Sequence, residues 1–571
     1  MLDTVIKDGI VVDGTGSPRR RADVGVSDGR IVALGRVDEP ARRTVDADGC
    51  IVAPGFVDVH THLDAQAFWD PMLGPSPLHG VTTAIGGNCG FTIAPLSEAA
   101  GGYLMRMLAR VEGMPLTSLE TGVPWDWTTT AEYLDRLDGT LAINAGFKVG
   151  HSALRRVVMG EAANERTATD DELGDMVRLL RDGLGAGAMG FSSTWAETHN
   201  DANGDPVPSR FADGHELVEL ARVCADYPGT SLEFLPVGTG AFGDEVAELM
   251  IAMSQAAHRP LNWNVISPSA ASLSKWLDKL AVSDRAQQRG AKVVGLTMPI
   301  DMRARFSFLS GFVLDVFEGW APVMAARPEE KLRILADPDH RRRLDEQAQA
   351  TPNMRHLAAW GQLVLTETFT AETKPFEGRT VGDVAGELGK DPFDALVDVA
   401  IADGLRTTFA RDVPPPSAAD WDARLQVWRD PRTVIGASDA GAHLDMIAAF
   451  RYATGMLEEA VREHGLLPLE EAIHMLTASP ARLYGLRDRG ELREGAWADL
   501  IVFDEDTVGS QPVGTRFDLP GGAGRLYADA TGIDMVMVNG TEIVRTGSYT
   551  DERPGTLLRA GRDTETPTLA L

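Results

Sequence analysis

A mostly apolar segment that ends in two histidines constrains the fold of this chain more than any other feature. Residues 51–59 are interrupted by Pro54 and Gly55 and lead into His60-Thr-His62. Side chains alternate along a β-strand, so both imidazoles would leave this strand on the same face. Two neutral imidazoles held on a rigid strand supply half of a transition-metal site. The pattern predicts a buried strand with a metal site at its end; the alternative is a chance His-x-His in a loop.

The same segment begins a series of four motifs. Asp58-Val-His-Thr-His62 resembles the first barrel strand of the amidohydrolase superfamily, which consists of metal-dependent hydrolases built on a TIM barrel. Gly86–Pro95, which reads Gly-Gly-Asn-Cys-Gly-Phe-Thr-Ile-Ala-Pro, resembles the D-aminoacylase (N-acyl-D-amino-acid deacylase) branch. Gly436–His443 is similar to the last barrel strand, and Leu476–Leu486 followed by Glu494–Asp504 resembles the C-terminal return of the superfamily. The motifs stand in the expected order over nearly the whole chain.

The resemblance implies roles for two residues and also shows where this chain departs from the family. It implies that Cys89 is a metal ligand and that Asp439 is the carboxylate that transfers protons. The D-aminoacylase pattern also places one histidine on strand five and another on strand six. Here strand five reads Ser231-Leu-Glu-Phe-Leu235 and strand six reads Leu261-Asn-Trp-Asn-Val265, without a histidine. The metal site of the family therefore cannot be transferred unchanged.

Composition limits the class of protein and its partners. The chain has 571 residues, of which 44% are hydrophobic and 24% charged, as in a folded protein with a large core. No apolar run is long enough to span a membrane, and Met1 leads directly into a strand-like segment instead of a signal peptide. A net charge of −29 argues against nucleic acid or an anionic membrane as a partner. Three cysteines form no disulfide framework, which predicts a cytoplasmic protein.

Short strand-like segments separated by Asp-Gly and Asn-Gly turns occur at both ends of the chain, over residues 4–50 and 499–544. We therefore predict a composite β-sandwich formed by residues 1–53 and 485–571. Residues 54–484 contain apolar strand candidates that alternate with helical patterns, which predicts an α/β fold of the (β/α)8 TIM-barrel type. The candidates are 51–60, 81–87, 141–149, 186–193, 230–236, 260–266, 291–298 and 433–438. The alternative, a doubly wound sheet, would require a glycine-rich loop after the first strand.

The interval between the seventh and eighth strand candidates is longer than one barrel helix requires. Residues 381–403 have a helical pattern, whereas residues 300–376 are surplus to the repeating unit. We predict that this surplus is a helical, lid-like insertion at the mouth of the barrel.

Polar side chains gather at the predicted C-terminal ends of the strands, where TIM-barrel enzymes place their active sites. They are His60, His62, Cys89, His151, Glu233, Asn262, Asn264, Asp439 and His443. Period-two alternation directs both asparagines into the barrel. Cys89 could instead be an apolar core residue, and Asp439 could instead cap a helix. His151 could contact substrate or serve the structure, and His443 could be a ligand, a neighbour of a ligand or solvated.

These residues predict one zinc ion bound by His60, His62, Cys89 and Asp439, with Glu233 as a further ligand; a second ion or another divalent metal stays open. Asp439 would take a proton from the attacking water and deliver it to the leaving nitrogen. The sequence has no Gly-x-Ser-x-Gly motif of a serine hydrolase where strand four ends. The predicted reaction is hydrolysis of an N-acyl amino acid, of D configuration by resemblance. The alternatives are another C–N bond (a cyclic amide, a dipeptide or a urea-like group) and a non-catalytic protein that binds small molecules.

A small-molecule substrate that bears a carboxylate needs a fixed cation in so acidic a protein. Arg451 follows Asp439 at a distance similar to that of an arginine in the D-aminoacylase pattern, and a planar guanidinium pairs with both carboxylate oxygens. We predict that Arg451 is this clamp, with Arg155 and Arg156 as the fallback; the alternative is a solvated arginine on a helix. Further candidates for contact with substrate are His151, Asn262, Asn264 and His443. The sequence leaves the oligomeric state open.

Overall fold

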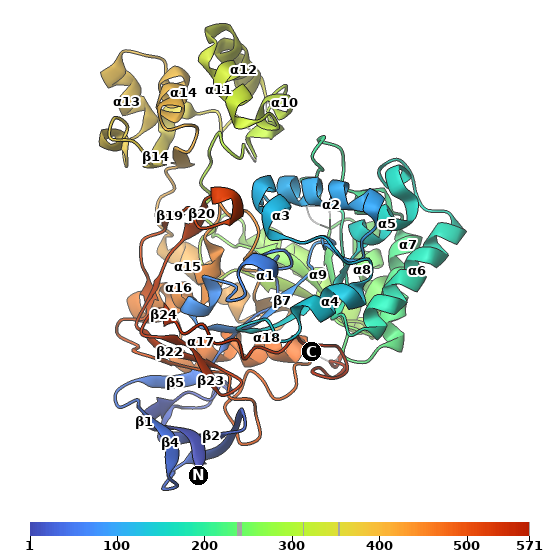
Figure 1. Ribbon diagram of the computed structural model, residues 1–571, viewed down its shortest axis with the longest axis vertical. Helices are drawn as coiled ribbons and strands as arrows, with labels where there is room; N and C mark the ends of the chain where they lie inside the picture. Colours follow the sequence, from blue (N-terminus) through green and yellow to red (C-terminus); the bar gives the residue numbers. More distant parts are fainter. Residues whose placement is uncertain (237–241, 312, 352–354, 570–571) are drawn as a thin grey trace.

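Parallel strands form the centre of the molecule (Figure 1). The computed structural model describes residues 1–236, 242–311, 313–351 and 355–569. The barrel strands are β6 (Phe56–Asp58), β7 (Val81–Gly86), β8 (Asn144–Phe147) with β9 (Val149–Gly150), β10 (Gly190–Thr194), β11 (Ser231–Leu235), β12 (Leu261–Ile266), β13 (Val293–Thr297) and β16 (Thr433–Ile435). They pair in the orders β6-β7-β8 and β9-β10-β11-β12-β13-β16, and β8 and β9 are two parts of the third strand on either side of Lys148. All eight predicted barrel strands are present.

The first and eighth strands meet just beyond their C-terminal ends. The backbone N–H of Asp439 donates to the carbonyl oxygen of His60 at 3.1 Å, and that of His62 donates to the carbonyl oxygen of Ala440 at 2.7 Å. Apolar side chains from the strands, together with Tyr484, form the core below this point. The predicted α/β fold with a TIM barrel is confirmed, and its two histidines lie where the circle of strands closes.

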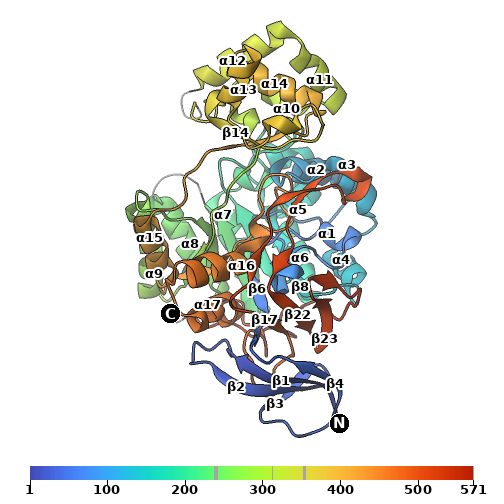
Figure 2. The ribbon, with the colours of Figure 1, turned by 90° about the vertical axis from the view of Figure 1, so that its left-hand side faces the viewer.

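Helices surround the strands (Figure 2). Several begin at a side chain that accepts a hydrogen bond from a free backbone N–H. At α4 and α6, Thr129 and Thr169 each bond the backbone of a glutamate three residues later, and that glutamate bonds back. The helices around the barrel include α1 (Gln66–Trp69), α2 (Glu98–Val111), α3 (Leu116–Gly122), α4 (Thr130–Leu137), α5 (His151–Met159), α6 (Asp170–Gly185), α7 (Gly214–Val223), α8 (Asp244–Ala257), α9 (Leu273–Gln288), α15 (Ala418–Trp428), α16 (Tyr452–Gly455), α17 (Leu469–Leu476) and α18 (Ala478–Leu483).

Strands from both ends of the chain pair in one sheet beside the barrel (Figure 1). They are β1 (Leu2–Val11), β2 (Arg20–Ser27), β3 (Arg30–Gly35), β4 (Ala41–Asp46), β5 (Ile51–Pro54), β17 (Leu500–Phe503), β22 (Ile533–Val538), β23 (Thr541–Arg545) and β24 (Ser548–Tyr549). The antiparallel pairing of β5 with β17 joins the two ends, and side chains such as Ile6, Val52 and Met537 share one core. Both ends of the chain therefore form the β-sandwich domain together, as the strand-like segments at the two ends predicted.

The predicted first strand, residues 51–60, is divided between the two domains at Gly55. Ile51–Pro54 belong to the sheet of the sandwich, and Phe56–Asp58 belong to the barrel. A Cβ on Gly55 would lie 2.1 Å from the side chain of Thr82 on β7, so only glycine fits where the chain passes from one sheet to the other.

The end of the chain does not belong wholly to the sandwich, in contrast to the predicted range 485–571. The N–H of Gly555 donates to the carbonyl oxygen of Leu141 (2.8 Å), and that of Leu558 donates to the carbonyl oxygen of Ala145 (2.8 Å). Leu558 is fully buried among residues of the barrel core. Residues 555–558 thus run along the third barrel strand, and Leu558 adds its side chain to the barrel core.

A buried ion pair connects the sandwich to the barrel. Asp499 pairs with Arg489 and also accepts hydrogen bonds from Asn144 Nδ2 (3.0 Å) and from the backbone N–H of Asn539 (2.8 Å). The side chains of Arg489 and Asp499 are 2% and 3% exposed, so neither charge reaches solvent.

Replacing Arg489 with methionine is expected to lower the free energy of unfolding by about 3–5 kcal/mol, because the change leaves an uncompensated buried carboxylate. Chemical denaturation would measure the loss. Arg493→Met is the matched control, since its pair with Asp488 is largely exposed (51% and 38%) and such pairs contribute about 0–1 kcal/mol. Equal losses in the two variants would contradict the prediction.

An insertion with its own core stands over the barrel (Figures 1 and 2). Its elements are α10 (Ala321–Met324), α11 (Pro328–Ala336), α12 (Pro338–Ala350), β14 (Leu363–Glu367), α13 (Val381–Leu388), α14 (Pro392–Ala402) and β15 (Thr408–Arg411). Trp320, Trp360, Phe393 and Phe409 are among the residues of this core. The predicted limit at residue 376 was therefore wrong, because α13 and α14 bury their apolar faces in the insertion and not on the barrel.

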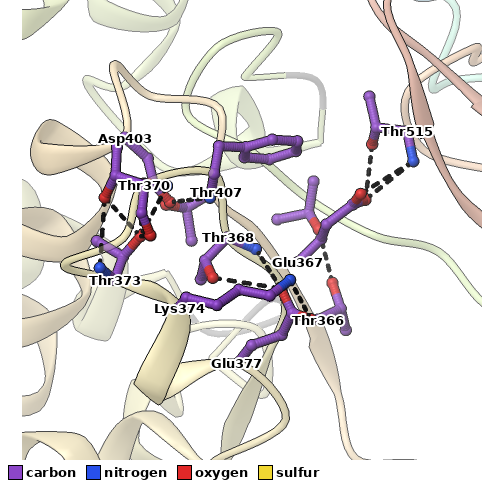
Figure 3. A network of polar contacts seen from close by, with 12 residues as sticks. Thr366, Glu367, Thr368, Thr370, Thr373, Lys374, Glu377, Asp403, Thr407 and Thr515 are labelled. Carbon is purple, nitrogen blue, oxygen red and sulfur yellow. Dashed lines mark hydrogen bonds and ion pairs between the residues drawn. The ribbon is translucent and has the colours of Figure 1, made fainter.

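A polar network fixes the base of the insertion (Figure 3). Asp403 accepts hydrogen bonds from the hydroxyls of Thr373 and Thr407, both at 2.6 Å. Glu367 accepts from the backbone N–H (3.1 Å) and the hydroxyl (2.7 Å) of Thr515 on β19 (Gly514–Arg516). The insertion is thus bonded to the hairpin of β19 and β20 (Arg525–Tyr527).

The part of the chain that the structure describes has no helix that is long and apolar enough to cross a membrane.

Candidate metal centre

His60 and His62 follow β6 and direct both Nε2 atoms toward one carboxylate. Asp439 Oδ1 lies 3.5 Å from His60 Nε2 and 3.1 Å from His62 Nε2. Both imidazoles are buried, and burial lowers the pKa of His60 to about 4, so its ring is neutral and able to bind a metal. The His-x-His pair and the aspartate of strand eight therefore meet, as the closure of the barrel between strands one and eight requires.

Cys89 completes a group of possible metal ligands. Its Sγ lies 3.6 Å from His60 Nε2, and the ligand atoms of His60, His62 and Cys89 all lie within 4.8 Å of one another. Burial raises the pKa of the Cys89 thiol well above its usual range. A thiol in such a place is an inert core residue unless a metal cation stabilises the thiolate.

Three separations between these atoms are close to those of a zinc site. With ordinary zinc bond lengths, neighbouring nitrogen and oxygen ligands lie about 3.4 Å apart, and neighbouring nitrogen and sulfur ligands about 3.6 Å apart. The observed separations are 3.1 and 3.5 Å for Asp439 with the two histidines, and 3.6 Å for Cys89 with His60. Imidazole, thiolate and carboxylate are all groups that zinc binds. Asp439 lies beside the two histidines but outside the group of three ligand atoms that Cys89 completes.

Buried charge around the group favours a bound cation. Burial raises the pKa of Asp58 to about 7, that of Asp64 to about 6 and that of Glu233 to about 7. Lys148 is buried among them, and burial lowers the pKa of its ammonium group to about 8. Burial also opposes the ionisation of Asp439, but hydrogen bonds with His60 and His62 hold its pKa well below the usual range. A bound divalent metal would favour the ionised forms of these carboxylates.

Glu112, which the sequence analysis missed, forms an ion pair with His62. It caps the end of α2, and its Oε1 lies 3.2 Å from His62 Nδ1, on the opposite side of the ring from Asp439. Burial would lower the pKa of His62, but the charges of Glu112 and Asp439 outweigh it and raise that pKa to about 9. A carboxylate bonded to the second nitrogen of a metal-binding histidine fixes its ring and increases its basicity.

The residues of strands five and six differ in their contacts. Asn264 Nδ2 lies 3.4 Å from His60 Nε2, and Asn262 Oδ1 accepts a hydrogen bond from the hydroxyl of Tyr484 at 2.9 Å. Both asparagines therefore face the barrel interior as predicted, but the carbonyl of Asn262 is bound below the mouth and not presented to a substrate. Glu233 Oε2 accepts from the backbone N–H of Cys89 at 2.8 Å, and Glu233 lies outside the group of three ligand atoms.

His151 is bound on both sides of its ring. Nδ1 lies 2.8 Å from Ser193 Oγ, and Nε2 lies 2.7 Å from Glu216 Oε1, which also pairs with Arg155. This arrangement leaves neither nitrogen of His151 for a substrate, so the predicted contact is corrected to a structural role. Because Arg155 is equally buried and paired, it is also excluded as the fallback clamp; Arg156 bonds the carbonyl oxygen of Gly160.

Two further histidines lie close to the centre, and Arg451 pairs with a glutamate on the following helix. His443 Nε2 is 3.8 Å from Asp439 Oδ2, which places His443 beside the predicted base. His199, not noticed in the sequence, bonds Thr194 Oγ1 at 2.9 Å; burial, then the charges of His443 and His62, lower its pKa to about 3. Arg451 lies 3.5 Å from Glu459 Oε1, longer than the roughly 2.7–2.9 Å of a strong charged hydrogen bond.

Comparisons with known proteins identify relatives of this chain. The amidohydrolase family matches residues 43–544. An uncharacterized protein of Mycobacterium tuberculosis (strain ATCC 25618 / H37Rv) is 30% identical over 98% of this chain and 96% of its own. The D-aminoacylase of Alcaligenes xylosoxydans xylosoxydans is 28% identical over 98% of this chain and 97% of its own. The crystal structure of N-acyl-D-glutamate deacylase from Bordetella bronchiseptica, complexed with zinc and a phosphonate inhibitor, is 28% identical with a TM-score of 0.65, covering 98% of this chain and 100% of that one.

These matches extend over nearly the full length of the chain and confirm the relationship to D-aminoacylases that the four motifs predicted. The chain belongs to the amidohydrolase family.

Proposed function

We propose that this protein hydrolyses the amide bond of an N-acyl-D-amino acid and that His60, His62 and Cys89 hold a catalytic zinc ion. One observation carries the proposal: Asp439 Oδ1 lies within 3.5 Å of both histidine Nε2 atoms, so a proton-accepting carboxylate adjoins the metal ligands. The relatives named D-aminoacylase and N-acyl-D-glutamate deacylase support the substrate class. The ion would supply Lewis acidity toward the scissile carbonyl and the attacking water.

The residues around the centre have separate tasks in this reaction. Asp439, whose carboxylate adjoins both histidines, accepts a proton from the attacking water and delivers it to the leaving nitrogen. Glu112 keeps the ring of His62 in place during both transfers.

The test combines metal analysis with a substrate screen. Protein purified without added metal or chelator is expected to contain zinc and to release free amino acid from N-acyl-D-amino acids faster than from their L enantiomers. Turnover of a cyclic amide, a dipeptide or a urea-like compound instead would move the function to another C–N bond. A zinc-loaded protein that turns over none of these compounds would contradict hydrolysis and favour a small-molecule-binding role.

Arg451 stays the predicted clamp for the substrate carboxylate. A guanidinium has five N–H donors, and the ion pair of Arg451 with Glu459 leaves donors for a ligand. Arg451→Met is expected to raise KM strongly for an N-acyl amino acid and to change KM little for the same amide with its carboxylate esterified. Steady-state kinetics on both compounds would measure the difference. An equal effect on both would show that Arg451 serves the fold.

A further inference from the structure

The chain segment that carries Cys89 has an unusual backbone conformation. This segment, residues 87–90, is called the Cys89 loop below, and it follows β7 directly. Cys89 has a φ of +54°, in the left-handed region that side chains with a Cβ disfavour. Such a residue persists only where its surroundings hold it in place. The position of Sγ beside His60 therefore depends on the groups that bind the Cys89 loop.

Side chains from three other barrel strands bind this loop. Glu233 on β11 accepts the backbone N–H of Cys89 through Oε2 at 2.8 Å. Lys148, between β8 and β9, donates through Nζ to Asn88 Oδ1 at 2.5 Å. Ser192 on β10 accepts the backbone N–H of Gly90 at 3.0 Å and donates to the carbonyl oxygen of Gly87 at 2.6 Å.

Asn88 transmits the contact of Lys148 to the first two barrel strands. Its Nδ2 donates to the carbonyl oxygens of Thr61 (3.0 Å) and Ile85 (2.9 Å), while Oδ1 faces Lys148. Thr61 stands between the two metal-binding histidines, so a shift of Asn88 would move the backbone on both sides of the site.

Glu233 and Lys148 are both buried. Glu233 binds the loop at the backbone of Cys89, and Lys148 binds it through the side chain of Asn88. The two residues therefore hold the Cys89 loop from two sides.

We propose that Glu233 and Lys148 are positioning residues for Cys89, which keep the Cys89 loop in the turn that directs Sγ toward His60. The inference deepens the proposed function and rests on it in one respect, namely that Cys89 binds the metal. It assigns Glu233 a role through the backbone of Cys89 in place of the predicted direct ligation. It also gives Lys148 a task that no motif indicated.

The test measures metal binding without the reaction. Cobalt(II) bound by a thiolate gives a charge-transfer absorption band, and competition with a chromophoric chelator gives the zinc Kd. Glu233→Ala removes the acceptor for the Cys89 N–H and is expected to weaken zinc binding about 10–100-fold and to reduce the band per bound cobalt. Glu233→Gln keeps an oxygen at that position and is expected to retain most of the affinity and the band.

Lys148→Met is expected to reduce the band and to weaken zinc binding by at least about tenfold, because Asn88 Oδ1 loses its donor. The matched control is Glu367→Gln, in which a glutamate that accepts the backbone N–H of Thr515 is changed at the base of the insertion (Figure 3). Its zinc Kd is expected to equal that of the unaltered protein. Thermal unfolding of each variant checks that the fold is intact.

The outcomes separate this inference from the proposed function. No thiolate band in the unaltered protein would overturn the ligand role of Cys89, and with it both proposals. A band in the unaltered protein that persists in Glu233→Ala and Lys148→Met, with the same zinc Kd, would overturn the positioning role alone. If Glu233→Gln binds zinc as weakly as Glu233→Ala, Glu233 is itself a ligand and the inference is wrong. Should Glu233→Ala fail to fold, the glutamine and Lys148 variants still decide.

Discussion

Replacing His60 or His62 with alanine is expected to release the bound metal and to abolish hydrolysis while the barrel stays folded. Each histidine offers one of the ligand atoms that lie within 4.8 Å of one another, and the group has no spare imidazole at that distance among the described residues. The fold should survive because the strands pair through their backbones and the apolar core lies below the site. Elemental analysis and amide hydrolysis would be measured on the same preparations.

His151→Ala is the matched control for this experiment. His151 also follows a barrel strand and is fully buried, but its ring bonds Ser193 and Glu216 and not the ligand group. Its removal should lower stability and leave the metal content unchanged. Full activity with retained metal in either His60→Ala or His62→Ala would end the assignment of the metal centre.

Asp439→Asn is expected to retain at least part of the metal and to lose about 10²- to 10⁴-fold in kcat, because an amide cannot accept and return the proton. His60, His62 and Cys89 remain to bind the ion. The measurement is kcat with zinc in excess, beside the metal content. Asp445→Asn is a suitable control, since Asp445 follows on the same loop but contacts Ser307 at 3.4 Å. A kcat for Asp439→Asn within about tenfold of the unaltered protein would place the base elsewhere.

The sequence allowed the strands and the centre of the site to be predicted because these signals are local. The apolar runs are short and bounded, and the alternation of side chains along a strand places His60 beside His62 without any tertiary information. The order of strands in a barrel then brings Asp439 next to them. The asparagines of strand six were placed in the interior by the same alternation.

Other features depend on partners that are distant in the sequence. Glu112 ends a surface helix in no recognisable motif, and only the packed structure brings it to His62. Lys148 lies within an apolar strand, and this position indicates a buried polar residue. The sequence does not indicate its partner, because Asn88 is 60 residues away. The role of His151 was undecided because Glu216, which occupies its second nitrogen, comes from α7.

The extent of the insertion could not be predicted, because a helical pattern in the sequence does not show where the helix packs. Residues 381–403 have the amphipathic pattern of a helix, and helices α13 and α14 are indeed there. The pattern does not specify which surface the apolar face will cover. Phe393 and Leu396 pack with Trp360 in the insertion, whereas the same spacing would also suit a helix on the outside of the barrel.

The pairing of β5 with β17 has a consequence for how the chain is made. Ile51–Pro54 leave the ribosome long before Leu500–Phe503, and at about 5–20 residues per second the delay is roughly 20–90 s. During that time β5 has one open edge whose free N–H and C=O groups can pair with another nascent chain. Crowded polysomes should therefore be the point of greatest aggregation risk, and a chaperone that shields residues 51–54 during translation should raise the yield of folded protein.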